Sequence, residues 1–270
     1  MAKSDSSAPS STRPTWMSNI SDSVSLASLS IPGTHNTMTY KGKGGALVRC
    51  QTWSLYAQLE AGIRFIDIRC RHFTTIFLFI MVLFTKTVIS PRFWIKSLDS
   101  LTITQEKTIL MRVRKEHTEE RNTRSMAETF KSYTSRYNSD YFWTSGSIPN
   151  LGAARRKVII LDDFAGGQVG MRYGGLDIDD KWEVRTVLKP SINKKWSSVS
   201  DHLKKARGAG SDRIFLTYSS GASGGAYPNA VAARINPKLL SFFNDNRGKW
   251  GIVAMDFPGE ELISKIINAN

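Results

Sequence analysis

Short apolar runs recur along the chain, and polar residues follow each of them. Their lengths and their content of β-branched residues are typical of strands. Near-continuous apolar sequence, as in Lys157–Leu161 (KVIIL), is typical of a parallel sheet that is buried on both faces. The six predicted strands are Ser25–Ile31, Ile63–Ile68, Thr108–Val113, Lys157–Leu161, Arg213–Tyr218 and Gly251–Met255.

Segments with helical periodicity lie between these runs. They are Ser54–Ala61, with Gly62 as a candidate C-cap, Ser125–Tyr133 and Val199–Ala206. Strands that alternate with helices indicate βα units and a mainly parallel sheet. No linker divides residues 15–270, and this length suits one α/β barrel of the TIM type. We therefore expect a single α/β domain.

Two segments lie outside this pattern. Residues 1–14 are polar and lack an apolar core, so we expect a disordered tail and no secretory signal peptide. The apolar run Ile76–Phe84 (IFLFIMVLF) is too short for a transmembrane helix, which needs about 20 residues. A buried strand and a membrane contact both remain open for this run.

The charge adds a constraint on partners. The 270 residues include 37 Lys and Arg against 23 Asp and Glu, a net charge of +14. This excess predicts attraction to nucleic acid or to an acidic membrane surface, and it does not choose between them. No recognisable nucleic-acid-binding motif is present, so we expect no nucleic-acid partner. Two cysteines, Cys50 and Cys70, exclude a disulfide-stapled scaffold, and no Cys/His cluster has zinc-ligand spacing.

Polar residues that follow the predicted strands suggest the chemistry. In α/β barrels the active site lies at the carboxyl ends of the strands. A histidine held by an aspartate is a common general base, and arginine matches phosphate oxygens. These types favour phosphoryl transfer or phosphodiester cleavage, although a plain ion pair between Asp67 and Arg69 is the simpler alternative. The strand-end residues are His35, Asn36, Asp67, Arg69, Arg71, Arg114, Lys115, Glu116, Asp162, Asp163 and Asp256.

The ordered series of motifs resembles one known family. Ser30–Thr37 (SIPGTHNT) and Phe65–Arg71 (FIDIRCR) resemble the bacterial-type phosphatidylinositol-specific phospholipase C family, which includes proteins with the X-type catalytic domain. The similarity continues through Leu110–Glu116, Leu151–Leu161 and Met255–Gly259. It implies a distorted TIM-type barrel. It also implies cleavage of phosphatidylinositol to diacylglycerol and inositol 1,2-cyclic phosphate, by attack of the inositol 2-hydroxyl on phosphorus.

The resemblance also implies the roles of individual residues. His35 matches the general base, Asp256 the residue that orients it, and Arg69 the group that stabilises the phosphate oxygens. An arginine at the place that calcium takes in metal-dependent relatives implies a reaction without metal or other cofactor. Asp67 is expected to support this network, and Asn36 stands where bacterial members often carry Asp. The positions that match headgroup contacts are Lys115, Arg155, Asp180 and Trp182.

The sequence departs from the family at the second catalytic histidine, the general acid that protonates the leaving oxygen. Residues 72–107 contain no His-Gly pair, which the family carries shortly after the FIDIR strand. His72 lies too near the preceding strand, His117 belongs to the next strand, and His202 is expected to be solvated on a helix. The chain as written is therefore expected to be a weak or inactive enzyme.

A shifted reading frame accounts for this departure. The codons for Met81-Val82 always spell Gly one base earlier, and the neighbouring codons allow Ile-His-His-Gly-Ile-Val-Tyr-Lys, which looks like the missing strand. We therefore hypothesise that residues from about 74 to 105 derive from a shifted frame, with genuine divergence as the alternative. Poor folding is the expected consequence.

These observations leave two functions open. One is a phosphatidylinositol phosphodiesterase with impaired turnover, and the other is an inactive module that binds anionic headgroups. For either, we expect a monomer that is cytoplasmic or attached peripherally to membranes containing phosphatidylinositol.

Overall fold

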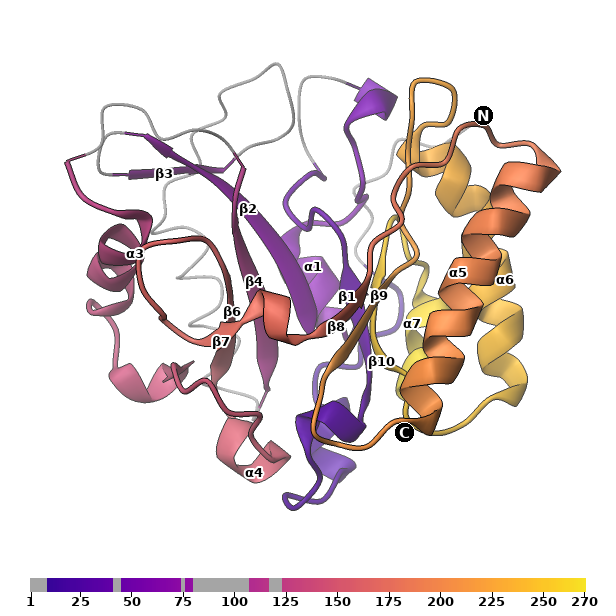
Figure 1. Cartoon of the computed structure of the whole chain (residues 1–270). Coiled ribbons are helices and arrows are strands. Elements are labelled where there is room, and N and C mark those ends of the chain that lie inside the picture. Colours follow the sequence, from indigo (N-terminus) through magenta and orange to yellow (C-terminus); the bar gives the residue numbers. More distant parts are fainter. Residues whose placement is uncertain (1–8, 41–44, 74–75, 80–106, 117–122) are drawn as a thin grey trace.

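A curled parallel sheet forms the centre of the molecule (Figure 1). The computed structural model describes residues 9–40, 45–73, 76–79, 107–116 and 123–270. Eight strands follow one another in the order β5-β6-β4-β2-β1-β10-β9-β8, and each neighbouring pair is parallel. The strands are β1 (Ser30–Thr34), β2 (Phe65–Phe73), β3 (Ile76–Phe79), β4 (Ile109–Lys115), β5 (Phe142–Trp143), β6 (Val158–Asp163), β7 (Met171–Arg172), β8 (Asp177–Asp179), β9 (Phe215–Tyr218) and β10 (Gly251–Met255).

The sheet curls, but the hydrogen bonds between its strands do not close it into a complete barrel. Strand β7 pairs with β6, and the 3₁₀ turn Tyr173–Gly175 then leads into β8 at the far end of the strand order. Within the described residues no backbone ladder joins β7 to β8. The expected α/β fold of the TIM type is confirmed as a parallel half-barrel in one domain.

Helices cover the outer face of the β1, β10, β9 and β8 half (Figure 1). Their ends follow the sequence: Ser54 and Ser125 accept hydrogen bonds from backbone N–H groups as N-caps of α1 and α3, and Pro190 and Pro228 stand in the first turns of α5 and α6. The helices are α1 (Leu55–Glu60), α3 (Met126–Thr134), α4 (Leu151–Ala154), α5 (Lys189–Gly208), α6 (Pro228–Asp245) and α7 (Glu260–Ile267).

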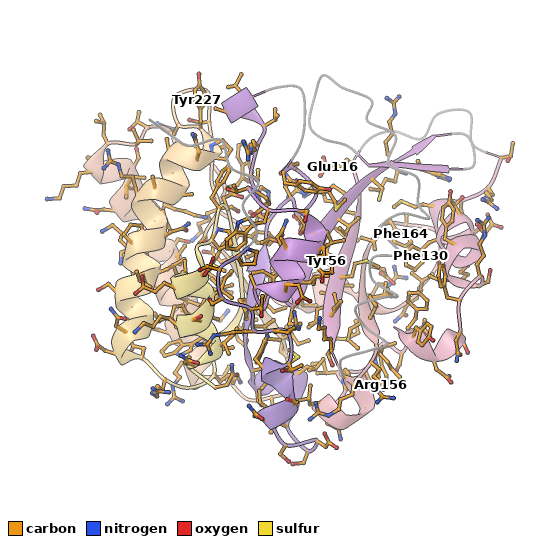
Figure 2. All side chains as sticks on the ribbon, turned by 180° about the vertical axis from the view of Figure 1, so that it is seen from behind. Tyr56, Glu116, Phe130, Arg156, Phe164 and Tyr227 are labelled. Atoms are coloured by element: carbon orange, nitrogen blue, oxygen red, sulfur yellow. The ribbon has the colours of Figure 1, made fainter. Side chains whose placement is uncertain are left out.

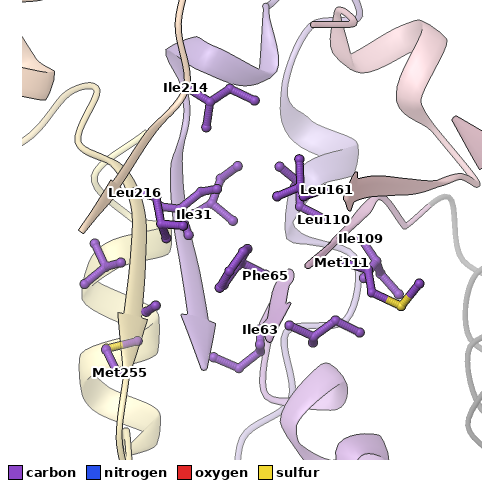
Figure 3. Close-up of a cluster of buried hydrophobic side chains, with 14 of the residues drawn as sticks. Ile31, Ile63, Phe65, Ile109, Leu110, Met111, Leu161, Ile214, Leu216 and Met255 are labelled. Atoms are coloured by element: carbon purple, nitrogen blue, oxygen red, sulfur yellow. The ribbon is translucent and has the colours of Figure 1, made fainter. Parts of the chain in front are cut away.

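The inside of the half-barrel is filled by apolar side chains from the strands (Figure 3). Phe65 lies in the middle of this cluster, fully buried, and its ring meets that of Tyr218 edge-to-face at 6.5 Å. Gly33 on β1 pairs with Phe65 on β2, and a Cβ at Gly33 would lie 2.7 Å from Cδ1 of Phe65. The glycine of the SIPGTHN motif is therefore needed for close packing of two strands.

Three parts of the chain add detail to the expected elements. The first strand begins at Ser30, because Leu26–Ser28 forms a 3₁₀ turn capped by Ser25. Residues 9–14, expected in a disordered tail, lie against the body: Ser10 and Ser11 bond to the Glu260 carboxylate. Of the two readings left open for the apolar run, a strand is present at Ile76–Phe79 as β3, which pairs antiparallel with β2. The remainder of that run, and most of the segment assigned to a shifted frame, lies outside the described residues.

Candidate active site

A cavity of about 490 Å³ opens at the carboxyl ends of the strands. Glu116, which lines it, lies near the same end of the molecule as Tyr227, whereas Arg156 lies at the other end (Figure 2). Strand-end residues predicted from sequence form much of its wall. The lining residues that carry polar side chains are His35, Asn36, Cys50, Arg69, Arg114, Glu116, Asp180, Trp182, Ser220 and Asp256.

A histidine–aspartate pair forms one side of the cavity. Nδ1 of His35 lies 2.8 Å from Oδ1 of Asp256, and the two side chains are 18% and 2% exposed. Burial by itself lowers the pKa of His35, but the adjacent Asp256 carboxylate, together with Cys50, raises that pKa to about 10. The parallel pairing of β1 with β10 fixes this contact, because both residues directly follow paired strand ends, Thr34 and Met255. The pair has the geometry of an oriented general base.

An ion-pair network forms the opposite side. Asp67 is buried on β2; its Oδ2 accepts from Nε of Arg69 at 3.1 Å and its Oδ1 from Nη1 of Arg112 at 3.3 Å. Burial alone would raise the pKa of Asp67, but the two guanidinium groups hold it well below its usual range. Arg69 also donates from Nη1 to Glu116 Oε1 at 3.0 Å. Arg69 is thus a fixed cation that lines the cavity.

Sequence reasoning did not single out Arg112. Its Nη2 lies 2.6 Å from Oδ2 of Asp163, its Nη1 donates to the Tyr218 hydroxyl at 2.9 Å, and its guanidinium stacks 4.0 Å from the centre of the Tyr173 ring. It therefore ties β4, β6 and β9 together beneath Asp67. The sequence did contain a signal for Arg112. It lies on β4, and the strands on either side, β2 and β6, carry the acids Asp67 and Asp163.

The remaining predicted site residues separate into two groups. Asp180 and Trp182 line the cavity, and Trp182 is 59% exposed. Asn36 also lines it, with a positive φ of 45° and its backbone N–H bonded to Oδ2 of Asp67 at 3.2 Å, so it shapes the turn after His35. Lys115 is not among the described lining residues; its neighbours Arg114 and Glu116 are.

Arg155, expected at a headgroup-contacting position, lies elsewhere. It follows α4 and precedes β6, so it belongs to the amino ends of the strands, near Arg156 (Figure 2). Its guanidinium bonds to the Asp22 carboxylate at 2.6 Å and to the carbonyls of Met17 and Ile20. The structure therefore gives Arg155 a structural role in holding the N-terminal segment, and this corrects its expected placement.

The other histidines bear on the missing general acid. His72 is buried on β2 and bonds through Nε2 to Oγ1 of Thr129 at 2.8 Å. His202, expected to be solvated, is buried on α5 between Thr217 and Asp177, because α5 packs against β8 and β9. His117 and the segment expected to carry a His-Gly pair lie outside the described residues. Among described residues, His35 alone of the histidines lines the cavity.

Comparison with known proteins identifies the family. Residues 25–163 match the family described as phosphatidylinositol-specific phospholipase C, X domain. The 1-phosphatidylinositol phosphodiesterase of Listeria monocytogenes is 31% identical, with 94% of this chain and 84% of that protein covered. That of Staphylococcus aureus is 23% identical over 94% of this chain and 93% of that protein.

Solved structures agree in fold. The phosphatidylinositol-specific phospholipase C of Listeria monocytogenes superposes with a TM-score of 0.80 at 28% identity, covering 96% of this chain and 99% of that chain. A variant of the Staphylococcus aureus enzyme superposes with a TM-score of 0.82 at 20% identity, covering 96% of this chain and 98% of that chain. The chain therefore belongs to the phosphatidylinositol-specific phospholipase C X-domain family.

Proposed function

We propose that this chain is a phosphodiesterase that cleaves phosphatidylinositol between glycerol and phosphate, without a metal cofactor. The inositol 2-hydroxyl attacks phosphorus, and the products are diacylglycerol and inositol 1,2-cyclic phosphate. The observation that carries this proposal is the placement of the His35–Asp256 pair and Arg69 around one cavity. The relatives named as 1-phosphatidylinositol phosphodiesterases support the substrate class.

Each residue has a role that its chemistry allows. Neutral His35 removes the proton from the 2-hydroxyl, and Asp256 holds the ring and stabilises the imidazolium that forms. Arg69, fixed by Asp67, offers a planar cation to the non-bridging phosphate oxygens, where charge builds up in the transition state. Asp180 accepts hydrogen bonds from inositol hydroxyls, and Trp182 packs against the ring.

The missing second histidine favours an impaired enzyme. Loss of a general acid costs about 10²- to 10⁴-fold in rate, most where the leaving group is a poor one such as an alkoxide. The alternative function, an inactive module that binds anionic headgroups, keeps the same cavity and the same cations. Among the described residues no second histidine lines the cavity, and this observation supports the alternative.

Release of inositol cyclic phosphate from phosphatidylinositol vesicles in EDTA tests the proposal. We expect measurable turnover that His35→Ala abolishes and that Tyr56→Ala, a change at an exposed position on α1 away from the cavity, leaves intact. Turnover that survives His35→Ala would contradict the proposed base. No turnover with intact vesicle binding would select the headgroup-binding module.

A substrate with a better leaving group isolates the missing acid. The p-nitrophenyl ester of inositol phosphate releases a phenolate, which needs little protonation, whereas phosphatidylinositol releases an alkoxide. We expect the rate deficit, relative to the Listeria monocytogenes enzyme, to be at least about 100-fold smaller for the p-nitrophenyl ester. Equal deficits for both substrates would show that this chain does not lack a general acid.

Membrane attachment is part of the same proposal. Within the described residues, no helix has the length and apolarity that crossing a bilayer requires. We infer a peripheral contact through the exposed apolar residues at the cavity, Leu47 and Trp182, which are 60% and 59% exposed. One structure of the Staphylococcus aureus enzyme comes from work on modulation of its membrane binding. A monomer, cytoplasmic or at the membrane surface, is the proposed state.

A further inference from the structure

Three side chains of different chemistry meet at the base of the cavity. One nitrogen of His35, the sulfur of Cys50 and a carboxylate oxygen of Asp256 all lie within 4.8 Å of one another. All three residues line the cavity. Fourteen residues lie between His35 and Cys50 in the sequence, and Asp256 lies far beyond both, so no sequence spacing indicates this cluster.

The backbone holds the three residues in this arrangement. The N–H of Cys50 donates to Oγ1 of Thr39, and its carbonyl accepts from the N–H of Phe257, which directly follows Asp256. Next to Cys50, the side-chain amide of Gln51 donates to the carbonyls of His35 and Met255. The loop that carries Cys50 is therefore bonded to both strand ends that carry the other two groups.

We propose that His35, Cys50 and Asp256 form a binding site for a sulfur-preferring divalent cation such as zinc. Imidazole nitrogen, thiolate sulfur and carboxylate oxygen are the three ligand types that zinc takes in proteins. Three protein ligands with one side open to a cavity leave the fourth tetrahedral position for water. The cluster offers these ligands on a fixed backbone, and its open side is the 490 Å³ cavity.

The geometry needs only a small adjustment. Nδ1 of His35 and Oδ1 of Asp256 are 2.8 Å apart across a proton. Around a tetrahedral zinc, nitrogen and oxygen ligands lie about 3.3 Å from each other, so the pair opens by about half an ångström. Cys50 releases its thiol proton as the zinc–sulfur bond forms. The imidazole binds as the neutral ring, through Nδ1 and with its one proton on Nε2, so an imidazolium at the start loses one proton to solvent.

Metal at this site regulates the proposed reaction, and this consequence rests on the proposed function. The ion occupies the Nδ1 lone pair of His35 and separates the ring from Asp256. The ring proton then sits on Nε2, so neither nitrogen can accept the 2-hydroxyl proton. Zinc is therefore an inhibitor of this chain rather than a cofactor. Inhibition by zinc depends on the Cys50 thiol, whereas the proposed reaction itself does not require a thiol.

Cobalt reports the site without any assay of turnover. We expect Co²⁺, titrated into the reduced, metal-free full chain, to give the near-ultraviolet sulfur-to-cobalt charge-transfer band at one equivalent, and Zn²⁺ to remove it. Cys70→Ser is the matched control, because Cys70 is the other free thiol, is buried in β2 and does not line the cavity. The band is expected in that variant and absent in Cys50→Ser and Cys50→Ala.

X-ray absorption at the zinc edge needs no variant at all. The one-to-one complex of the unaltered chain is expected to show one sulfur at about 2.3 Å and nitrogen or oxygen ligands at about 2.0–2.2 Å. A shell of oxygen and nitrogen alone would overturn the proposal. So would a cobalt band that persists in both Cys50 variants.

Inhibition is measured against each variant's own rate without metal. We expect the zinc concentration for half inhibition to rise at least about 100-fold in Cys50→Ser and to stay unchanged in Cys70→Ser. Equal inhibition of both variants would contradict regulation through this site. A chain that shows the Cys50-dependent band but no turnover would contradict the proposed function and leave the metal site standing.

Discussion

At the scale of single residues, the contact between His35 and Asp256 sets the proton affinity of the base. Burial lowers the pKa of His35 while Asp256 and Cys50 raise it to about 10, so His35 is protonated over a wide range of pH. Asp256→Asn removes the carboxylate and should lower that pKa from about 10 towards 6.5. NMR titration of the His35 ring, assigned with His35→Ala, measures it directly.

The raised pKa of His35 also affects the pH dependence of the rate. Neutral His35 is the reactive form, so the rate rises with pH through the pKa of His35, and Asp256→Asn should move this rise to lower pH. The maximal rate should fall about 100-fold, because the ring loses the group that orients it. Asp180→Asn is the control: it removes the same charge from the same cavity without touching His35. Equal pKa changes in both variants would contradict a specific pair.

Asp67 is the second residue whose charge is fixed by its neighbours. Its pKa lies well below the usual range because of Arg69 and Arg112, so the ion pairs stabilise the fold above about pH 4 and lose this effect as the pH falls. Asp67→Asn should lower the free energy of unfolding by about 3 kcal/mol at pH 7 and by somewhat less at pH 3, with the rest of the effect lost at still lower pH. Urea unfolding at both values measures the difference, and a gap that widens in acid would refute the assignment.

At the scale of elements, the glycine of the SIPGTHN motif lets two strands pack. Gly33→Ala would place a methyl group 2.7 Å from Cδ1 and 2.8 Å from Cβ of Phe65, so one strand must move. We expect a loss of about 1–3 kcal/mol in the free energy of unfolding. Gly174→Ala, where a new Cβ meets nothing within 4 Å, should change it little.

A second substitution tests the cause of that loss. Phe65→Ala removes Cδ1 and Cγ and keeps only Cβ, so it relieves the part of the clash that comes from the ring. The double variant Gly33→Ala/Phe65→Ala should therefore lose less than the sum of the single changes. Additive losses would show that the Ala methyl group acts on something other than the Phe65 ring.

Local sequence predicted β2, β4, β6, β9 and β10, missed the short strands β5, β7 and β8, and did not indicate which strands pair. Apolar runs and caps such as Ser54 and Ser125 place elements through short-range physics, and β6 and β10 were expected within a residue or two. Pairing direction is set by distant contacts, so the antiparallel β3 could not be inferred from its own apolar run. His202 was misplaced for the same reason: α5 buries it against Thr217 of β9.

Sequence order likewise predicted some residues of the candidate site and missed others. His35, Arg69 and Asp256 stand directly at strand ends, where a parallel barrel gathers side chains, so sequence order was enough to bring them together. Arg155 was assigned from the resemblance alone, although the predicted strand Lys157–Leu161 already put it at the amino end of a strand, away from the carboxyl ends where the cavity lies. Cys50 sits on a loop without periodicity, and nothing short of three-dimensional contact places it beside His35.

At the scale of the whole molecule, a net charge of +14 and an exposed aromatic at the cavity act together on an anionic membrane. The charge predicts that binding to vesicles containing phosphatidylinositol weakens steeply with salt, because exposed charges are screened beyond about 8 Å at physiological ionic strength. Partial burial of Trp182 in the bilayer surface, worth about 1.4 kcal/mol, adds a contribution that salt does not remove.

Two matched variants separate these contributions. Trp182 and Tyr56 are 59% and 57% exposed, but only Trp182 lines the cavity, and Tyr56 lies on α1, well below Tyr227 (Figure 2). Trp182→Ser should weaken vesicle binding about tenfold at every salt concentration, whereas Tyr56→Ser should leave it unchanged. Sedimentation with vesicles at low and high salt measures both effects. Equal losses of vesicle binding in the two variants would contradict a membrane contact at the cavity. They would mean that an aromatic side chain away from the cavity contributes as much to binding as one that lines it.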